Sequence, residues 1–214
     1  MEKILCASMM CADFGNLRES VHQLEEAGID VFHCDIMDGT FVPNFTMGVT
    51  DVKAIAAAAT KPVDCHLMID NPANKVEWFI KAGASIIYIH PESERYVVKT
   101  LAHIKELGAS AGIALNPDTS IPSIEEILHL CDYVMGMTVN PGFSGQKFVQ
   151  FTRDKIARLA KLKEKDGCKS MVDGACSPQV IDDLSKLGAD GFVLGTSALF
   201  REGGTYAQPL AALR

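Results

Sequence analysis

The chain has 214 residues, of which 48% are hydrophobic, and this content is enough to fill a sizeable core. Its 20 Lys and Arg residues against 27 Asp and Glu residues give a net charge of −7, which argues against a nucleic-acid-binding groove. The apolar run at the N-terminus is too short for a signal peptide, and no stretch reaches transmembrane length. The seven scattered cysteines contain no Cys-x-x-Cys motif and predict reduced thiols, so we expect a cytoplasmic protein without a membrane partner.

Short apolar runs alternate with amphipathic stretches along the chain. Eight runs are strand candidates: residues 4–9, 31–37, 63–69, 85–90, 111–116, 133–140, 170–173 and 191–195. Apolar residues at three- and four-residue steps predict helices at 17–27, 76–82, 97–107, 124–130, 156–165 and 180–187, with a short last helix at 206–213. Glycines such as Gly28 and Gly83 follow several of these helices, where they end a helix before the next strand.

Eight strand-then-helix units in a chain of this length predict a parallel (β/α)8 barrel. No linker, charge block or low-complexity tract interrupts the chain, so we expect one barrel domain over residues 1–214. A doubly wound open sheet is the alternative, but the sequence has neither a dinucleotide-binding nor a P-loop glycine motif to support it.

Polar residues stand at the carboxyl ends of the predicted strands. In a (β/α)8 barrel these ends carry the catalytic residues, whereas the interior is normally filled with Val, Ile and Leu. Polar groups gathered there need a partner, such as a metal ion or a polar substrate. These residues are Ser8, His33, Asp35, His66, His90, Asn116, Asn140 and Asp173.

Two short His–Asp segments point to a metal site. His33 and Asp35 are two residues apart in a predicted strand, so their side chains face the same way. His66 is a natural third ligand and Asp173 a natural fourth, because both end apolar runs and imidazole with carboxylate suits a divalent cation. Cys34 and Cys65 alternate with these ligands and are expected to face the helices instead.

The loops after the last three predicted strands are rich in small residues. They contain Gly142 to Gly145, Gly174-Ala175 and Gly195-Thr196. Barrels often hold phosphate between the loops after strands seven and eight, and backbone N–H groups can cup an anion without a cationic side chain. We therefore expect a phosphate group to bind at these loops.

The chain resembles the ribulose-phosphate 3-epimerase family from Ser8 to Phe200. The matching segments are residues 8–14, 33–44, 64–68, 115–117, 137–146, 172–174 and 195–197, of which 33–44 and 137–146 are highly specific. The resemblance implies a (β/α)8 barrel, inversion at C3 of a phosphorylated ketose, and a homo-oligomer. It also implies one divalent metal ion, Zn²⁺ or Fe²⁺ and less often Mn²⁺ or Co²⁺.

The residues suit that chemistry. Inversion at C3 removes a proton on one face and returns one on the other, so two acid/base groups are expected, and Asp35 and Asp173 form the pair. A cis-enediolate intermediate carries negative charge that a metal can stabilise. The resemblance implies that His33, Asp35, His66 and Asp173 are the metal ligands and that Asp35 takes the proton.

The resemblance also implies contacts with substrate. Ser8 and His66 match residues that touch the sugar, and three methionines match the wall of the reaction chamber: Met37, Met68 and Met137. The phosphate-side loops match at Gly142, Phe143, Ser144, Gly145, Gly174, Ala175, Gly195 and Thr196.

Three departures from the usual family pattern bear on the substrate. Gly174-Ala175 stands where many members have Gly-Gly. Residues 142–145 read Gly-Phe-Ser-Gly, with Ser144 in place of the glycine of the usual Gly-Phe-Gly-Gly. Residues 8–11 read Ser-Met-Met-Cys where Ser-Ile-Leu-Ser is commoner. These variants resemble the allulose-6-phosphate branch. The expected reaction therefore interconverts D-allulose 6-phosphate with D-fructose 6-phosphate, D-ribulose 5-phosphate with D-xylulose 5-phosphate, or both.

Other functions on the same fold remain as alternatives. A Schiff-base aldolase needs a strand-end lysine, but Lys169 begins its strand and Lys147 lies in a loop. A phosphate-sugar decarboxylase would show Asp-x-Lys-x-x-Asp. Asp51 and Lys53 begin this pattern, but Ala56 stands where its second aspartate would be. A non-catalytic phosphosugar-binding barrel shares every motif and would fail only to exchange the C3 proton.

Two polar residues near the site have plainer interpretations. His90 could contact substrate, but a hydrogen-bonded histidine at a strand end is the simpler expectation. Asp38, followed by Gly39, is expected to form a turn.

Overall fold

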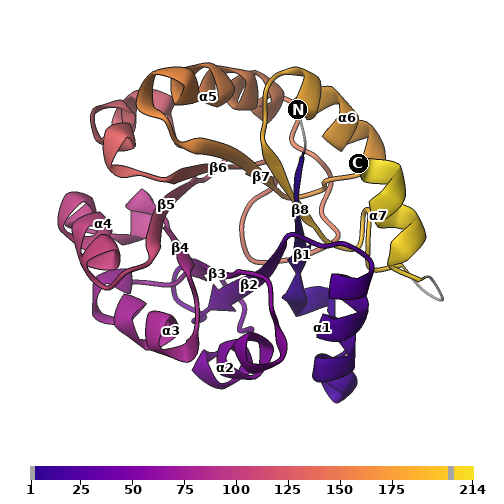
Figure 1. Ribbon diagram of the computed structural model, residues 1–214. Helices are drawn as coiled ribbons and strands as arrows, with labels where there is room; N and C mark the ends of the chain where they lie inside the picture. The colour runs from indigo at the N-terminus through magenta and orange to yellow at the C-terminus, as the bar shows by residue number, and fades with distance from the viewer. Residues whose placement is uncertain (1–2, 202–204) are drawn as a thin grey trace.

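Eight parallel strands close into a barrel in the computed structural model, and they pair in chain order until β8 returns to β1 (Figure 1). The structure describes residues 3–201 and 205–214, and for residues 163–166 it describes the backbone alone. The strands are β1 (Ile4–Ser8), β2 (Val31–Met37), β3 (Val63–Met68), β4 (Ile86–Ile89), β5 (Ser110–Leu115), β6 (Tyr133–Met137), β7 (Lys169–Asp173) and β8 (Gly191–Leu194). The predicted (β/α)8 barrel is confirmed, and the open-sheet alternative is excluded.

Helices surround the barrel and follow the strands in sequence (Figure 1). They are α1 (Leu17–Glu26), α2 (Val49–Ala58), α3 (Val76–Ala82), α4 (Val97–Glu106), α5 (Thr152–Asp166), α6 (Pro178–Lys186) and α7 (Ala207–Leu213). Within the described ranges, no helix has both the length and the apolar character that a membrane crossing requires.

Two helical regions of the structure differ from the prediction. The helix α2 has no counterpart among the predicted helices, because six of its ten residues from Val49 to Ala58 are alanine, threonine or aspartate, which give little apolar periodicity. The stretch predicted as a helix over residues 124–130 is instead a 3-10 helix, η6 (Glu125–Leu130), preceded by η5 (Ile121–Ser123). Apolar spacing in so short a segment does not distinguish the two windings.

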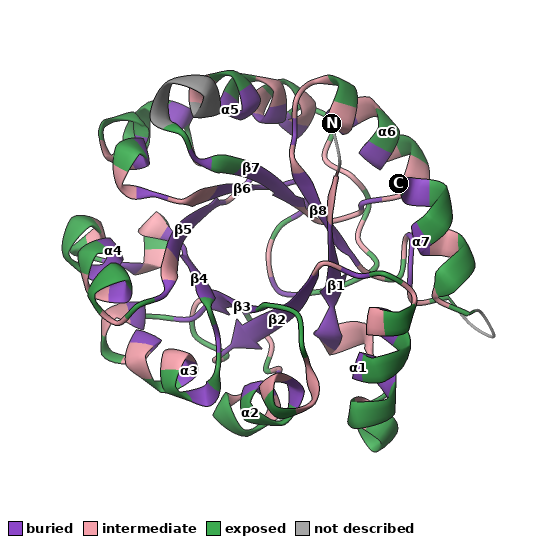
Figure 2. Ribbon diagram, in the orientation of Figure 1, coloured by how far each residue is buried: buried purple, intermediate pink, exposed green. Residues whose placement is uncertain are grey.

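The strands separate two apolar layers. Side chains that point outward, such as Phe32, Cys34 and Cys65, pack with the helices in the larger core. Side chains that point inward fill the barrel, with Tyr88, Met135 and Met171 among them. Figure 2 shows the strands almost wholly buried and the outer helix faces exposed. The predicted outward orientation of Cys34 and Cys65 is confirmed.

Candidate active site

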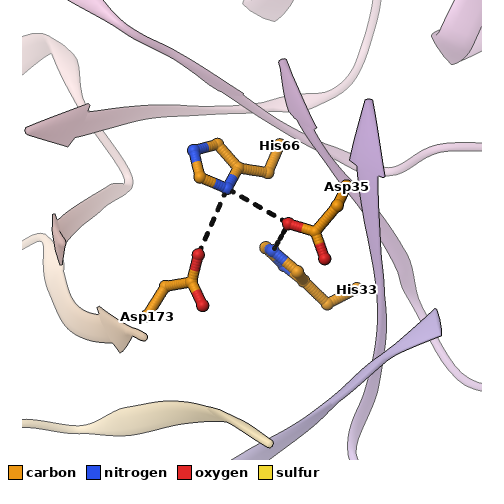
Figure 3. A group of neighbouring side chains, drawn as sticks. All are labelled: His33, Asp35, His66 and Asp173. Carbon is orange, nitrogen blue, oxygen red and sulfur yellow. Dashed lines mark ion pairs between the residues drawn. The ribbon is translucent and has the colours of Figure 1, made fainter. Parts of the chain in front are cut away.

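Four side chains converge above the barrel interior: His33, Asp35, His66 and Asp173 (Figure 3). One ligand atom from each lies within 4.8 Å of the other three. Asp35 Oδ1 is 3.3 Å from His33 Nε2 and 3.6 Å from His66 Nδ1, and Asp173 Oδ2 is 3.5 Å from His66 Nδ1. The structure therefore brings together the residues that sequence spacing alone suggested as a group.

Strand alternation and register explain why they meet. His33 and Asp35 lie two residues apart in β2 and point into the barrel, while Cys34 between them points outward. Asp35 of β2 is the register partner of His66 in β3, so these two side chains are direct neighbours. Asp173 is the last residue of β7 and reaches the group from across the barrel.

The donor atoms suit a divalent metal ion. His33 Nε2 and His66 Nδ1 are fully buried and have no hydrogen-bond partner, although a buried ring nitrogen normally needs one. A tetrahedral site with bonds of about 2.0–2.2 Å holds neighbouring ligand atoms about 3.3–3.6 Å apart, and three of the pairs lie at 3.3, 3.6 and 3.5 Å. Two imidazoles and two carboxylates are also ligands that zinc and iron(II) accept. The four residues can therefore hold such an ion.

The electrostatics of the group favour a positive charge at its centre. Burial lowers the pKa of His33, but Asp64 and Asp35 outweigh it and raise that pKa well above its ordinary value. Burial raises the pKa of the Asp35 carboxyl, but His33 and His66 outweigh it and hold that pKa well below its usual range. The buried carboxylates thus attract either protons on the imidazoles or a bound cation.

Asp64 is a functional candidate that sequence reasoning missed. Its Oδ1 lies 2.6 Å from His33 Nδ1, the ring nitrogen that faces away from the four-residue group, and both residues are buried. A carboxylate in this position fixes the orientation and tautomer of a ligating histidine. The signal was available, because Asp64 and His66 have the same two-residue spacing as His33 and Asp35.

A cleft opens above the four-residue group and is lined by most of the predicted site residues. Asp35 and Asp173 border it, whereas His33 and His66 are wholly buried and do not line it. The other predicted residues along the cleft are Ser8, Met37, Met68, Met137, Gly142, Phe143, Ser144, Gly145, Gly174, Ala175, Gly195 and Thr196. Cys11, the last residue of the Ser-Met-Met-Cys segment, also borders it, although it is not among the predicted site residues.

Ser8 supports one of the two carboxylates. Its hydroxyl donates a hydrogen bond of 2.8 Å to Asp35 Oδ2, and both residues are buried. Ser8 ends β1, the strand that pairs with β2, so the bond joins neighbouring strand ends. Its predicted contact with the sugar stays a prediction.

The glycine-rich loops adopt backbone conformations that few other residues accept. Gly142, Gly145 and Gly174 have φ values of +119°, +77° and +106°. Ala175, which replaces a second glycine, also has a positive φ of +48°. The Ala175 side chain therefore does not prevent the turn, and its backbone still borders the cleft.

The loops after β2 and β6 hold each other in place at the cleft. Asn44 Nδ2 donates a 2.7 Å hydrogen bond to the carbonyl of Gly142. Asp38 forms the predicted turn, since its Oδ1 accepts from the N–H groups of Thr40 and Phe41 and its Oδ2 accepts from Asp70 N. Asp38 does not border the cleft.

Comparison with known proteins assigns the chain to a family. A profile of the ribulose-phosphate 3 epimerase family matches residues 4–200. The chain belongs to this family. It is 39% identical to ribulose-phosphate 3-epimerase of Aquifex aeolicus (strain VF5) over 91% of this chain and 88% of that protein. It is 40% identical to ribulose-phosphate 3-epimerase of Synechocystis sp. (strain ATCC 27184 / PCC 6803 / Kazusa) over 99% of this chain and 93% of that protein.

The family consists of isomerase-class enzymes, and the fold agrees with a wider structural group. The crystal structure of 3-hexulose-6-phosphate synthase from Salmonella typhimurium superposes with a TM-score of 0.73, covering 100% of this chain and 96% of that one. Its 17% identity supports a shared fold alone.

Proposed function

We propose that the protein is a metal-dependent 3-epimerase of a phosphorylated D-ketose that uses Asp35 and Asp173 as its two acid/base groups. The observation that carries the proposal is the position of the two carboxylates. They come from β2 and β7, flank the buried His66 Nδ1 at 3.6 and 3.5 Å, and both border the cleft. A ketose bound between them would present opposite faces of C3 to the two residues.

The chain supplies the proton transfers. Asp35 removes the C3 proton, which is acidified by the neighbouring carbonyl, and an enediolate remains. Asp173, which enters the step as the carboxylic acid, then donates its proton to the opposite face and so inverts C3, and Asp35 is left protonated. Ser8 holds the Asp35 carboxylate in place through its hydrogen bond to Oδ2. His33, Asp35, His66 and Asp173 would hold a divalent cation, which would supply Lewis-acid stabilisation of the developing negative charge.

Other parts of the cleft suit the rest of the substrate. Backbone N–H groups of the loops after β6, β7 and β8 would bind the phosphate, and none of the described residues lining the cleft is Lys or Arg. Met37 and Met68 pack with Val42 beside the carboxylates, and Met137 lies at the end of β6. Their apolar side chains would limit the access of water to the enediolate.

The substrate length is the finer part of the proposal. The chain aligns closely with enzymes named for ribulose phosphate, which favours the pentulose, whereas its Ala175, Ser144 and Cys11 variants favour the hexulose. We propose that both D-ribulose 5-phosphate and D-allulose 6-phosphate are substrates. The kcat/KM values of the two, measured side by side, decide which one the cleft prefers, and no turnover of either would overturn the proposal.

The two-carboxylate mechanism is tested with Asp35→Asn and Asp173→Asn in D2O. We expect the wild type to incorporate deuterium at C3 as it epimerises, and each variant to lose at least about 100-fold in kcat/KM. Metal content is measured in parallel, because both residues are also proposed ligands. Asp38→Asn is the matched control, since Asp38 lies in the same motif but outside the cleft.

The outcomes separate the alternatives. Epimerisation at the wild-type rate by either variant, or full-rate C3 exchange by both, would contradict the two-base mechanism. A wild-type protein that binds both sugar phosphates yet exchanges no C3 proton would be a phosphosugar-binding barrel. Full activity in a preparation shown to be free of metal would exclude the metal requirement.

A further inference from the structure

A buried chain of polar side chains leads from the four-residue group away from the cleft. His66 Nε2, the ring nitrogen opposite Nδ1, lies 2.8 Å from His90 Nε2. His90 Nδ1 in turn lies 3.4 Å from Glu92 Oε2. His66 and His90 are wholly buried, and none of these contacts is needed by the proton transfers proposed above.

The two imidazoles meet in the geometry of an N–H···N hydrogen bond. Their planes differ by 23°, and their ring centroids are 5.0 Å apart although the two Nε2 atoms are separated by only 2.8 Å. The rings therefore face each other edge to edge rather than face to face. One nitrogen must donate and the other accept, because two lone pairs or two protons would repel.

The carboxylate of Glu92 determines the direction of this bond. An ionised carboxylate attracts a proton and offers none, so a neutral His90 places its single N–H on Nδ1, 3.4 Å from Glu92 Oε2. This contact depends on charge and is not a well-formed hydrogen bond. His90 Nε2 is then the acceptor, and His66 donates from Nε2. When His66 donates from Nε2, its Nδ1, which lies between Asp35 and Asp173, is the nitrogen whose lone pair a metal ion would take.

Hydrogen bonds and packing also fix Glu92 and His90, which form the end of this series farthest from the four-residue group. Glu92 Oε1 accepts from the backbone N–H of Asn116 at 3.1 Å and from the Thr119 hydroxyl. The ring of Phe41 covers His90 with a centroid separation of 4.8 Å. These contacts hold the Glu92 carboxylate beside His90.

We propose that His90 and Glu92 are positioning residues that hold His66 in the tautomer with a free Nδ1, and so set the affinity of the site for its metal ion. The inference rests on the proposed metal-binding role of His66. It assigns His90 no contact with substrate, because its side chain lies behind His66 and does not border the cleft. Substitution of His90 should therefore leave sugar binding unchanged.

The test measures the dissociation constant of Zn²⁺ by competition with a chromophoric chelator, together with KM and kcat at saturating Zn²⁺. His90→Leu removes the acceptor, and we expect it to weaken Zn²⁺ binding about 10–100-fold with KM unchanged. His90→Gln retains an acceptor near the position of Nε2 and should restore most of the affinity. Glu92→Gln can also donate, which permits the opposite tautomer, and should weaken Zn²⁺ binding by at least about threefold.

Ile89→Val is the matched control, since Ile89 ends β4 directly before His90 but packs toward the helices. It should loosen packing without changing Zn²⁺ affinity. Wild-type affinity in folded His90→Leu, or equal loss in His90→Leu, His90→Gln and Ile89→Val, would overturn the inference. If His90→Leu does not fold, Glu92→Gln serves as the test variant. Wild-type Zn²⁺ affinity in Glu92→Gln would then overturn the inference. Zn²⁺ binding that His66→Ala leaves unchanged would instead overturn the metal site itself, and this inference with it.

Discussion

Individual residues differ in how far their roles could be predicted from the sequence. His33, Asp35, His66 and Asp173 were predictable as a group, because the two-residue period of a strand puts His33 and Asp35 on one face and the barrel brings strand ends together. The two-residue spacing could place Asp64 on the same strand face as His66, but the roles of Asp64 and His90 needed the structure. Their roles depend on which ring nitrogen of His33 and His66 they approach, and sequence spacing carries no information on ring orientation.

Asp64 gives a prediction at the residue scale. Asp64→Asn removes the negative charge 2.6 Å from His33 Nδ1, and we expect metal affinity to fall about 10–100-fold. The free energy of unfolding of the metal-free protein should change little, because burial of the Asp64 carboxyl opposes the charge that His33 favours and the amide oxygen of the variant can still accept from His33 Nδ1. Chelator competition and urea unfolding measure the two quantities.

Cys65→Ala is the companion variant for Asp64→Asn. Cys65 is the next residue on β3 but packs outward, so it should leave metal affinity unchanged. An Asp64→Asn protein that binds metal as tightly as the wild type would show that the contact with His33 does not orient that ring.

At the scale of elements, the strands were predicted well and the helices less so. Apolar runs bounded by turn residues located every strand within a few residues, and β2 matched at both ends, because buried parallel strands are continuous apolar segments. The helix α2 was missed and η6 was taken as an α-helix, because small or short apolar faces give weak periodicity. The loops, which carry much of the cleft, have conformations that depend on contacts between them.

The contact between the loops after β6 and β7 gives a prediction at this scale. A Cβ on Gly174 would lie 2.6 Å from Val139 Cγ2 and 3.0 Å from Val139 N, and its φ is +106°. Gly174→Ala should therefore lower the free energy of unfolding by about 2–4 kcal/mol, from backbone strain and overpacking together. Urea unfolding of the metal-free protein measures the change.

Gly28→Ala separates the two contributions. Gly28 has a φ of +93°, but a Cβ there meets no atom within 4 Å, so only backbone strain of about 1–2 kcal/mol is expected. If both variants lost the same stability, the approach of Val139 to Gly174 would not be a tight contact in solution.

At the scale of the whole molecule, side-chain contacts join the two ends of the described chain. Lys3 Nζ, just before β1, donates to the carbonyls of Leu213 and Arg214 at 2.7 and 3.1 Å. Arg214 Nη1 lies 2.9 Å from Asp30 Oδ2, in the segment that leads into β2. Closure in this order was predictable from eight strand-helix units, but these contacts were not, because they join residues far apart in the sequence.

The overall charge gives the last prediction, which depends on the proposed substrate. The chain carries a net charge of −7, and the described residues that line the cleft include no Lys or Arg to offset it. A sugar phosphate is a dianion near neutral pH, so long-range repulsion should slow its approach at low salt. The Debye length falls from about 30 Å at 0.01 M to about 8 Å at 0.15 M ionic strength, which screens this repulsion.

We therefore expect kcat/KM to rise with NaCl over this range, whereas a phosphate site built from lysines and arginines would show a fall. Tetramethylammonium chloride at equal ionic strength is the control for specific cation effects, and phosphate and sulfate are avoided because they would compete at the loops. A kcat/KM that falls as either salt is added would mean that positive potential within the cleft outweighs the charge of the whole molecule. Backbone N–H groups and the bound cation would then have to dominate the field that the substrate meets.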